Sequence, residues 1–176
     1  MSTETDDEEA AASAARAESL QRLSESAIAS MSGLRVLVVE DNVVNATLVR
    51  LLLERDGCVV GAAASGVQAL EMLRTQAWHV VLMDCQMPEM DGYATTRYWR
   101  HLELSERRPR LPILALTAHA MAEDRKRCLD AGMDDYLTKP VKLDALREVL
   151  SRYAGVIAIE PPPAGPEPVL PEPTAT

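Results

Sequence analysis

Five short apolar runs alternate with longer amphipathic segments along the middle of the chain. The runs at residues 36–39, 80–83 and 113–116 contain only aliphatic residues and methionine. Such uninterrupted runs are typical of parallel strands that are buried on both faces, and the segments between them are long enough for crossover helices. The pattern predicts an α/β fold, in which a doubly wound, five-stranded parallel sheet carries helices on both sides.

The segments between the runs show the spacing of amphipathic helices. In the first segment, four apolar residues fall on one face of a helix that ends before Gly57. These four residues are Val44, Leu48, Leu51 and Leu52. The expected strands begin near residues 36, 59, 80, 111 and 134, and the last three end at Asp84, Thr117 and Lys139. The expected helices cover 44–55, a segment that Ser65 caps, 93–104, 121–131, and a last segment that carries Leu143, Leu146, Leu150 and Tyr153.

The two ends of the chain differ in composition from this repeating part. Residues 1–33 are rich in Ala, Ser and Glu, and residues 10–29 could form a helix with a thin apolar stripe at Leu20, Leu23 and Ile28. We predict a flexible or loosely helical tail there. Residues 156–176 are rich in proline, which predicts an extended tail or linker. The expected folded domain covers residues 34–155.

Net charge gives no case for nucleic-acid binding. The chain has a formal charge of −9, but residues 34–155 hold 17 acids against 16 bases, so nearly all of the excess lies in the tails. No apolar run approaches the roughly 20 residues of a membrane helix, and the acidic N-terminus is unlike a secretory signal. Cys58, Cys85 and Cys128 are too widely spaced for a zinc site. We expect buried thiols in a cytoplasmic protein without membrane contact.

Acidic residues, a threonine, a tyrosine and a lysine lie at or near the ends of the apolar runs. They are Glu40-Asp41, Asp84, Thr117, Tyr136 and Lys139. In a parallel sheet the carboxyl ends of the strands meet at one edge, so these residues should lie close together. Crowded carboxylates cannot all stay ionised unless a cation joins them. The sequence therefore predicts either a divalent-metal site or a group of strongly shifted pKa values.

The carboxylates have simpler explanations when each is taken alone. An Asp at a strand end often caps the following turn, and an acid before a helix is a normal N-cap. Asn42 could supply that cap unaided, which leaves Glu40 and Asp41 unexplained. Several carboxylates at one edge suit a hard cation such as Mg²⁺.

A hydroxyl and an ammonium extend the chemistry that these acids can support. Together with a metal, Lys139 would neutralise charge on a transferring phosphoryl group, and Thr117 would donate a hydrogen bond to one of its oxygens. Asp84 would then be the nucleophile and would form an acyl phosphate.

Four ordered stretches resemble the receiver domain of two-component response regulators. They are Val-Leu-Val-Val-Glu-Asp-Asn (36–42), Leu-Met-Asp-Cys-Gln-Met-Pro-Glu-Met-Asp-Gly (82–92), Ala-Leu-Thr-Ala (115–118) and Asp-Asp-Tyr-Leu-Thr-Lys-Pro (134–140). The resemblance covers about residues 34–153, and its wording looks most like receivers of hybrid sensor histidine kinases. It implies a flavodoxin-like (CheY-like) fold of five strand–helix units.

The resemblance also implies a role for each residue of the group. Asp84 matches the phosphoacceptor. Asp41, Asp84 and the main-chain carbonyl of Gln86 would hold Mg²⁺, with Glu40 acting through water. Thr117 and Lys139 would bind phosphoryl oxygens, and Tyr136 matches the aromatic residue whose rotamer reports phosphorylation. Gln86 and His119 match positions that set the lifetime of the phosphoryl group, although a lone His is more often an ordinary surface residue.

The function implied is that of a signalling switch and not of a dedicated enzyme. A histidine kinase or a histidine phosphotransfer protein would give its phosphoryl group to Asp84, and the helix at 44–55 would contact that donor. The face built from the fourth helix, the fifth strand and the fifth helix would then repack and bind an unidentified output protein.

Three other functions are weighed against this one. A phosphatase of the dehalogenase type also uses a strand-end Asp with Mg²⁺, but it needs a second Asp where this chain has Gln86. A protein-binding scaffold that works without phosphorylation and a phosphate sink both stay open. So does the choice between a single-domain regulator, which Met1 favours, and a receiver cut from a longer hybrid kinase.

Overall fold

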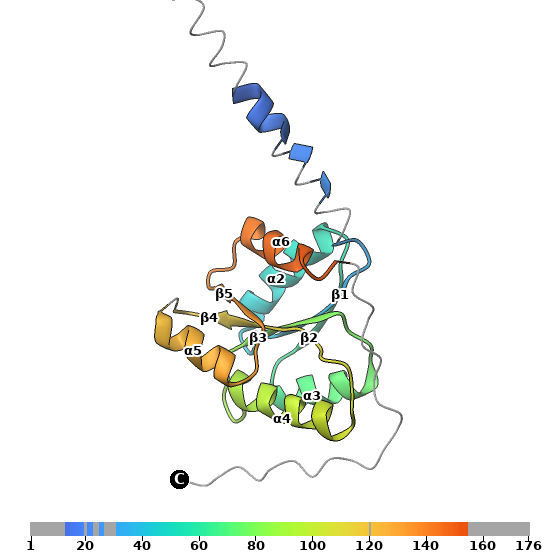
Figure 1. Cartoon of the computed structure of the whole chain (residues 1–176), viewed down its shortest axis with the longest axis vertical. Helices are drawn as coiled ribbons and strands as arrows, with labels where there is room; N and C mark the ends of the chain where they lie inside the picture. Colours follow the sequence, from blue (N-terminus) through green and yellow to red (C-terminus); the bar gives the residue numbers. More distant parts are fainter. Residues whose placement is uncertain (1–12, 20, 23–24, 27–30, 120, 155–176) are drawn as a thin grey trace, which may run out of the picture.

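Five parallel strands form one sheet in the order β2-β1-β3-β4-β5. The structure is a computed structural model that describes residues 13–19, 21–22, 25–26, 31–119 and 121–154 (Figure 1). The strands are β1 (Arg35–Val39), β2 (Val59–Ala63), β3 (Val80–Asp84), β4 (Ile113–Thr117) and β5 (Asp135–Thr138). The helices that follow them are α2 (Val43–Arg55), α3 (Gly66–Thr75), α4 (Gly92–Ser105), α5 (Ala122–Asp130) and α6 (Leu143–Ser151). The predicted doubly wound α/β fold is confirmed.

The helices cover both faces of the sheet, with α2 and α6 on one side and α3, α4 and α5 on the other (Figure 1). Alternate residues of each central strand therefore enter two separate apolar cores. Leu37 and Val39 of β1 belong to the core under α3 and α4, whereas Val36 and Val38 belong to the core under α2 and α6. The strands β3 and β4 are buried along their whole lengths. This explains why their sequences are apolar at every position before the last.

Side-chain caps fix where three of the helices begin. The Asn42 side chain accepts hydrogen bonds from the backbone N–H groups of Val44 and Asn45, and Ser65 accepts one from Gln68. Both caps were expected from the sequence. Asp91 accepts a hydrogen bond from Ala94 and starts α4 in the same way. The chain thus turns sharply after β1 and β3, and the polar residues between strand and helix stay at the sheet edge.

The apolar face of α2 is not the one that the spacing of its residues suggested. Val44, Leu48 and Leu51 are 76%, 46% and 55% exposed, and the buried residues of the helix are Val49 and Leu53. Of the four residues of the expected face, only Leu52 packs against the core, where it is partly buried. This helix carries apolar residues on most of its sides, so their periodicity could not identify the side that faces the sheet. The result is an apolar surface on α2 that the described part of the chain leaves open to solvent.

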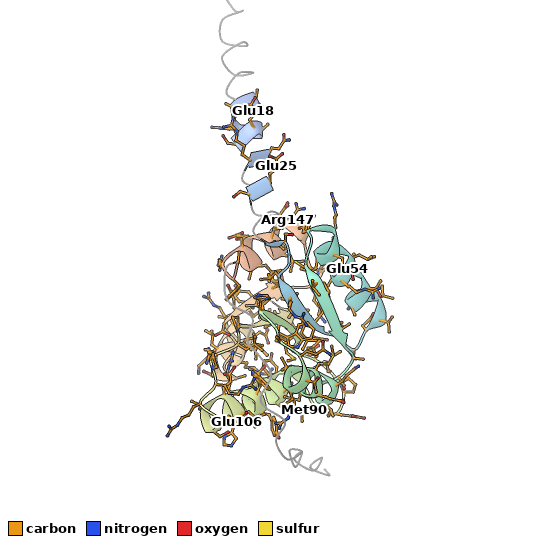
Figure 2. All side chains as sticks on the ribbon, turned by 90° about the vertical axis from the view of Figure 1, so that its right-hand side faces the viewer. Glu18, Glu25, Glu54, Met90, Glu106 and Arg147 are labelled. Atoms are coloured by element: carbon orange, nitrogen blue, oxygen red, sulfur yellow. The ribbon has the colours of Figure 1, made fainter. Side chains whose placement is uncertain are left out.

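The far end of α2 is tied to α6 by a buried ion pair. Arg147, which is labelled in Figure 2, donates from Nε to Asp56 Oδ2 at 2.6 Å and from Nη2 to Oδ1 at 2.7 Å. The Asp56 side chain is only 2% exposed. This two-point contact orients the two helices of one sheet face relative to each other.

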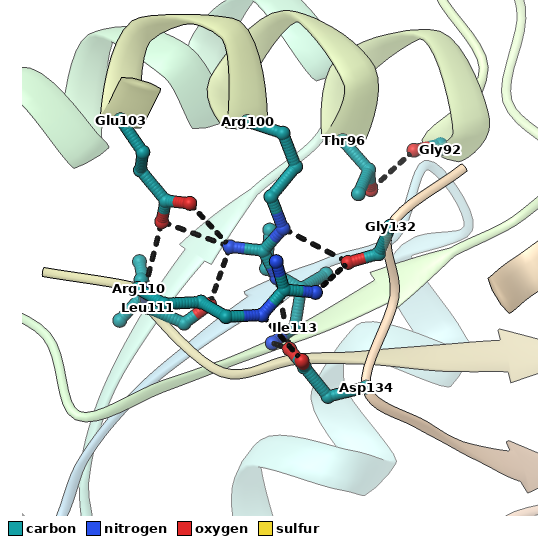
Figure 3. A network of polar contacts seen from close by, with 9 residues as sticks. All are labelled: Gly92, Thr96, Arg100, Glu103, Arg110, Leu111, Ile113, Gly132 and Asp134. Atoms are coloured by element: carbon teal, nitrogen blue, oxygen red, sulfur yellow. Dashed lines mark hydrogen bonds and ion pairs between the residues drawn. The ribbon is translucent and has the colours of Figure 1, made fainter. Parts of the chain in front are cut away.

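A buried arginine holds together the amino ends of β4 and β5 (Figure 3). Arg100 of α4 donates from Nη1 to Glu103 and to the Leu111 carbonyl oxygen, and from Nε to the Gly132 carbonyl oxygen, all at 2.8 Å. Its Nη2 donates to Asp134 Oδ2, also at 2.8 Å. The network therefore lies at the amino ends of the strands, opposite the carboxyl ends that carry the predicted polar residues. It joins α4 to the loops that precede β4 and β5.

Part of the predicted organisation lies outside the described residues. Residues 13–19 are helical. Leu20, Leu23 and Ile28 of the expected apolar stripe, and the proline-rich segment 156–176, are not among the residues that the structure describes. Within those that it does describe, no helix is long and apolar enough to cross a membrane.

Replacing Arg100 with Met should strongly destabilise the domain. The change removes the buried guanidinium that pairs with Glu103 and Asp134, although Arg110 still pairs with Asp134. Loss of one partner from a buried ion pair costs about 3–5 kcal/mol of unfolding free energy. Urea unfolding followed by circular dichroism measures this. Arg152→Met is the matched control, because Arg152 is 53% exposed and its pair with Asp135 should be worth about 1 kcal/mol or less. Equal losses in the two variants would contradict the assigned role of Arg100.

Candidate functional site

Four strand ends bring the predicted polar residues to one edge of the sheet. Val39 of β1 pairs in register with Met83 of β3, so the next residues along the two strands, Glu40 and Asp84, are neighbours. Asp84 pairs with Leu116 of β4, which places Thr117 one step further along. Lys139 follows β5 directly and donates its backbone N–H to the Thr117 carbonyl oxygen.

The acidic residues form a compact cluster. One carboxylate oxygen from each of Glu40, Asp41 and Asp84 lies within 4.8 Å of the other two. Glu40 and Asp84 are each only 3% exposed, whereas Asp41 is open to solvent. All the donor atoms are carboxylate oxygens, which is the ligand set that Mg²⁺ and similar hard cations require. The cluster fits such an ion, with the exposed Asp41 on the side from which the ion would enter.

Lys139 lies between the two buried acids. Its Nζ is 2.6 Å from Glu40 Oε2 and 3.0 Å from Asp84 Oδ1. Burial alone would lower the pKa of Lys139, but the hydrogen bonds to Glu40 and Asp84 outweigh it and raise the pKa above its ordinary value. The ammonium therefore stays charged and neutralises part of the acidic cluster.

For the carboxyl group of Asp84, burial has a larger effect on the pKa than the hydrogen bonds do. Burial raises the pKa of its carboxyl group above the ordinary value, and hydrogen bonds from the Gln86 backbone N–H and from Lys139 offset only part of that effect. The Gln86 N–H lies 3.1 Å from Asp84 Oδ1. A second cation beside Asp84 would favour its ionised, nucleophilic form.

Glu40 is held by α2 as well as by Lys139. Its Oε1 accepts weak hydrogen bonds from the Asn42 backbone N–H at 3.3 Å and from Asn45 Nδ2 at 3.4 Å. The sequence reasoning did not single out Asn45. Its position three residues after an N-cap, on the helix that follows the acidic pair, is the signal that could have indicated it.

The Thr117 hydroxyl is turned toward its own loop and not toward Asp84. It donates to the His119 carbonyl oxygen at 3.0 Å and accepts from the His119 backbone N–H at 3.2 Å. Tyr136 is half-buried, and the Arg125 guanidinium lies over its ring at 5.6 Å from the centroid. Both residues therefore lie near the site, but Thr117 is bonded to the His119 backbone and Tyr136 contacts Arg125.

A polar cavity of about 440 Å³ opens beside the site. Residues from the loop after β3, the start of α4, the end of β4 and α5 line it: Cys85, Gln86, Met87, Asp91, Tyr93, Thr117, His119, Asp124 and Arg127. The predicted lifetime-tuning residues Gln86 and His119 are both exposed and share this wall. Their spatial proximity agrees with the sequence-based hypothesis, and their effect on a phosphoryl group stays a prediction.

Two backbone features complete the site. The Lys139–Pro140 peptide bond is cis. A Cβ atom added to Gly92 would lie 2.1 Å from the Asp84 carbonyl oxygen, so only glycine allows α4 to begin this close to β3. The sequence analysis began this helix at residue 93 and did not identify the contact of Gly92.

The family model of the response regulator receiver domain matches residues 36–151. The sensor protein GacS of Pseudomonas syringae pv. syringae is 44% identical over 129 residues, which are 73% of this chain and 14% of GacS. The sensor histidine kinase RcsC of Salmonella typhi is 44% identical over 119 residues, 68% of this chain and 12% of RcsC. The chain thus spans about an eighth of the length of these relatives.

Solved structures with the same fold include two that are informative about the site. The receiver domain of the sensor histidine kinase PA1611 from Pseudomonas aeruginosa, with a magnesium ion coordinated in its active-site cleft, is 44% identical and has a TM-score of 0.62; the match covers 70% of this chain and 99% of that one. A chain from the co-crystal of the Saccharomyces cerevisiae phosphotransfer protein Ypd1 with the receiver domain of Ssk1 is 29% identical, with a TM-score of 0.67 and coverage of 70% and 90%. This chain belongs to the family of response regulator receiver domains.

Proposed function

We propose that this chain is a phosphorelay receiver whose Asp84 accepts a phosphoryl group from a phosphohistidine with the help of Mg²⁺. The observation that carries the proposal is the position of Lys139 Nζ, 2.6 Å from Glu40 and 3.0 Å from Asp84, beside an acidic cluster that fits a divalent cation. Such a chain is a signalling switch and not a dedicated enzyme. The donor would be a histidine kinase or a histidine phosphotransfer protein, and the three buried free thiols suit a reducing cytoplasm.

The transfer step forms one bond and breaks one. A carboxylate oxygen of Asp84 attacks phosphorus, and the phosphorus–nitrogen bond of the phosphohistidine breaks, with its electron pair returning to the imidazole ring. Bound Mg²⁺ supplies positive charge at the phosphoryl oxygens. Asp41 and Asp84, with the Gln86 carbonyl oxygen and with Glu40 through water, would hold this ion. Lys139 would exchange its contact with Asp84 for one with a phosphoryl oxygen.

Phosphorylation would then change the surface of α5, β5 and α6. To donate to a phosphoryl oxygen, Thr117 must release the His119 carbonyl and move toward Asp84, which draws the loop before α5 with it. The space that Thr117 leaves lets Tyr136 turn inward, away from Arg125. The altered face is where an output protein would bind, with the phosphoryl charge as the trigger.

The open apolar surface of α2 is the expected contact for the donor. Val43, Val44, Leu48 and Leu51 are between 46% and 76% exposed. A small cavity that adjoins this surface is lined by Leu48 and Asn45 of α2 together with Glu40 and Lys139 of the site. A protein that covers α2 would therefore reach the phosphorylation site from the same side. The Ypd1 complex with the Ssk1 receiver supports a phosphotransfer protein as the partner.

Asp84→Asn should abolish phosphorylation by a small donor. Wild-type protein incubated with Mg²⁺ and acetyl phosphate should gain the mass of one phosphoryl group, because Asp84, one of the two buried carboxylates that Lys139 contacts, is the proposed nucleophile. Intact-protein mass spectrometry measures the gain. A gain that survives in Asp84→Asn, or no gain in the wild type, would refute the proposed function. Unchanged partner binding by Asp84→Asn would instead favour a phosphorylation-independent scaffold.

Leu48→Glu on α2 should slow transfer from a phosphohistidine protein while leaving labelling by acetyl phosphate unchanged. A charge placed in an apolar contact weakens donor binding, and a loss of about 1.4 kcal/mol corresponds to a tenfold lower rate at subsaturating donor. The measurement uses a phosphohistidine protein that labels the wild type, with phosphorylated Ypd1 as the first one to test. Leu104→Glu is the control, since Leu104 is 81% exposed on α4. Equal slowing by both changes would argue against α2 as the donor contact.

Mg²⁺ should stabilise the protein through the acidic cluster. At about 100 times its dissociation constant, an ion that binds only the folded state raises the unfolding free energy by about 2.7 kcal/mol. Urea unfolding with Mg²⁺ and with EDTA measures the difference, which Asp41→Asn should largely remove. Glu89→Gln serves as the control because Glu89 is an exposed acid outside the cluster. The same Mg²⁺ effect in Asp41→Asn as in wild type would refute this metal site.

A further inference from the structure

Helix α5 is held in place by few contacts. Of its nine residues only Cys128 is buried, and no side chain caps its amino end at Met121. Its other visible attachments are two arginines over aromatic rings: Arg125 over Tyr136 at 5.6 Å and Arg127 over Tyr93 at 4.8 Å. Partly exposed contacts of this kind contribute little to stability. Cys128 is therefore the main anchor of α5 to the domain.

That anchor touches the residue next to the phosphoacceptor. The Sγ atoms of Cys85 and Cys128 are 3.8 Å apart, although 43 residues separate them in the sequence. Each residue is 2% exposed. Cys85 follows Asp84 directly, at the end of β3. The sulfur–sulfur contact thus joins the phosphorylation site to the helix that would have to move.

The pair is buried but is not sealed from small molecules. Cys85 forms part of the wall of the cavity of about 440 Å³ beside Thr117 and Gln86. A molecule as small as hydrogen peroxide fits easily into such a space. Burial raises the pKa of the Cys85 thiol to about 12, so its oxidation should be slower than that of an exposed thiol.

We propose that peroxide converts Cys85 and Cys128 into a reversible disulfide that fixes α5 to the end of β3 and prevents the phosphorylation-dependent change. In the first step the Cys85 sulfur attacks one peroxide oxygen; the oxygen–oxygen bond breaks, and a sulfenic acid and one water form. In the second step the Cys128 sulfur attacks the sulfenic sulfur, and a disulfide and a second water form. Two thiols are oxidised, one peroxide is reduced, and added dithiol reverses the change.

The geometry needs only a small adjustment for this bond. The two sulfur atoms must approach from 3.8 Å to about 2.0 Å, and Cys128 is the only residue within α5 that is buried against the domain. Once formed, the disulfide would hold α5 covalently at the end of β3. The non-bonded contact that it replaces allows α5 to move away. The effect of the disulfide on the phosphorylation-dependent change rests on the proposed function, whereas formation of the disulfide does not.

The first experiment tests the bond alone. The Cys58→Ala variant keeps only Cys85 and Cys128, because the chain has three cysteines. Treatment of the folded variant with hydrogen peroxide should remove two hydrogen atoms from its intact mass, and dithiothreitol should restore them. Cys58→Ala/Cys128→Ser is the matched control and should lose none. Peroxide treatment that leaves the Cys58→Ala mass unchanged, or that adds only oxygen atoms, overturns the proposal.

The second experiment tests the effect on the switch. Reduced and oxidised Cys58→Ala protein are labelled with acetyl phosphate and Mg²⁺, and amide hydrogen exchange is measured in the segment 121–131. Labelling should change exchange there in the reduced protein, and the change should be absent in the oxidised one. Equal changes in both forms overturn the effect on the switch but leave the proposed function intact. If the reduced protein takes no label on Asp84, the proposed function fails, and the effect on the switch fails with it.

Discussion

The contact of one ammonium group with two buried carboxylates is the interaction on which the site depends. Adjacent parallel strands place Glu40 and Asp84 side by side, and both are almost wholly removed from water. Two such charges would repel each other strongly in a poorly polarisable interior. Lys139 makes this arrangement tolerable in the absence of a metal, because it donates to both. The same crowding leaves a deficit of positive charge, which a divalent ion in the acidic cluster would offset.

Most of the fold and most of the site could be predicted because both follow from backbone periodicity. Parallel strands end at a common edge, so residues such as Asp84 and Thr117, which follow apolar runs, had to be neighbours whatever their side chains did. The orientation of individual side chains could not be predicted in this way. Whether Thr117 faces Asp84 or His119 depends on a few hydrogen bonds in one loop, and no pattern along the chain records that choice. The contribution of Asn45 was missed for the same reason.

The misjudged face of α2 has a physical origin. Leu48 and Leu51 of α2 were assigned to an apolar face by spacing, yet the sheet is contacted by Val49 and Leu53 on another side of the same helix. Spacing identifies a face only when the opposite face is polar. The burial of Arg100 was not anticipated, because the sequence around it does not mark this charged residue as buried. Apart from Glu103 on the same helix, its partners come from two loops that only the tertiary structure brings to it.

The position of the Arg100 network has a consequence for how a signal can travel through this domain. It binds α4 to the loops that precede β4 and β5, at the edge of the sheet farthest from Asp84. The amino ends of both strands are therefore fixed, while their carboxyl ends carry Thr117 and Lys139. Strands held in this way cannot slide along each other. We expect the register of the sheet to be identical in both states of the domain, so that the difference between them lies in the loops, in α5 and in side chains such as Tyr136.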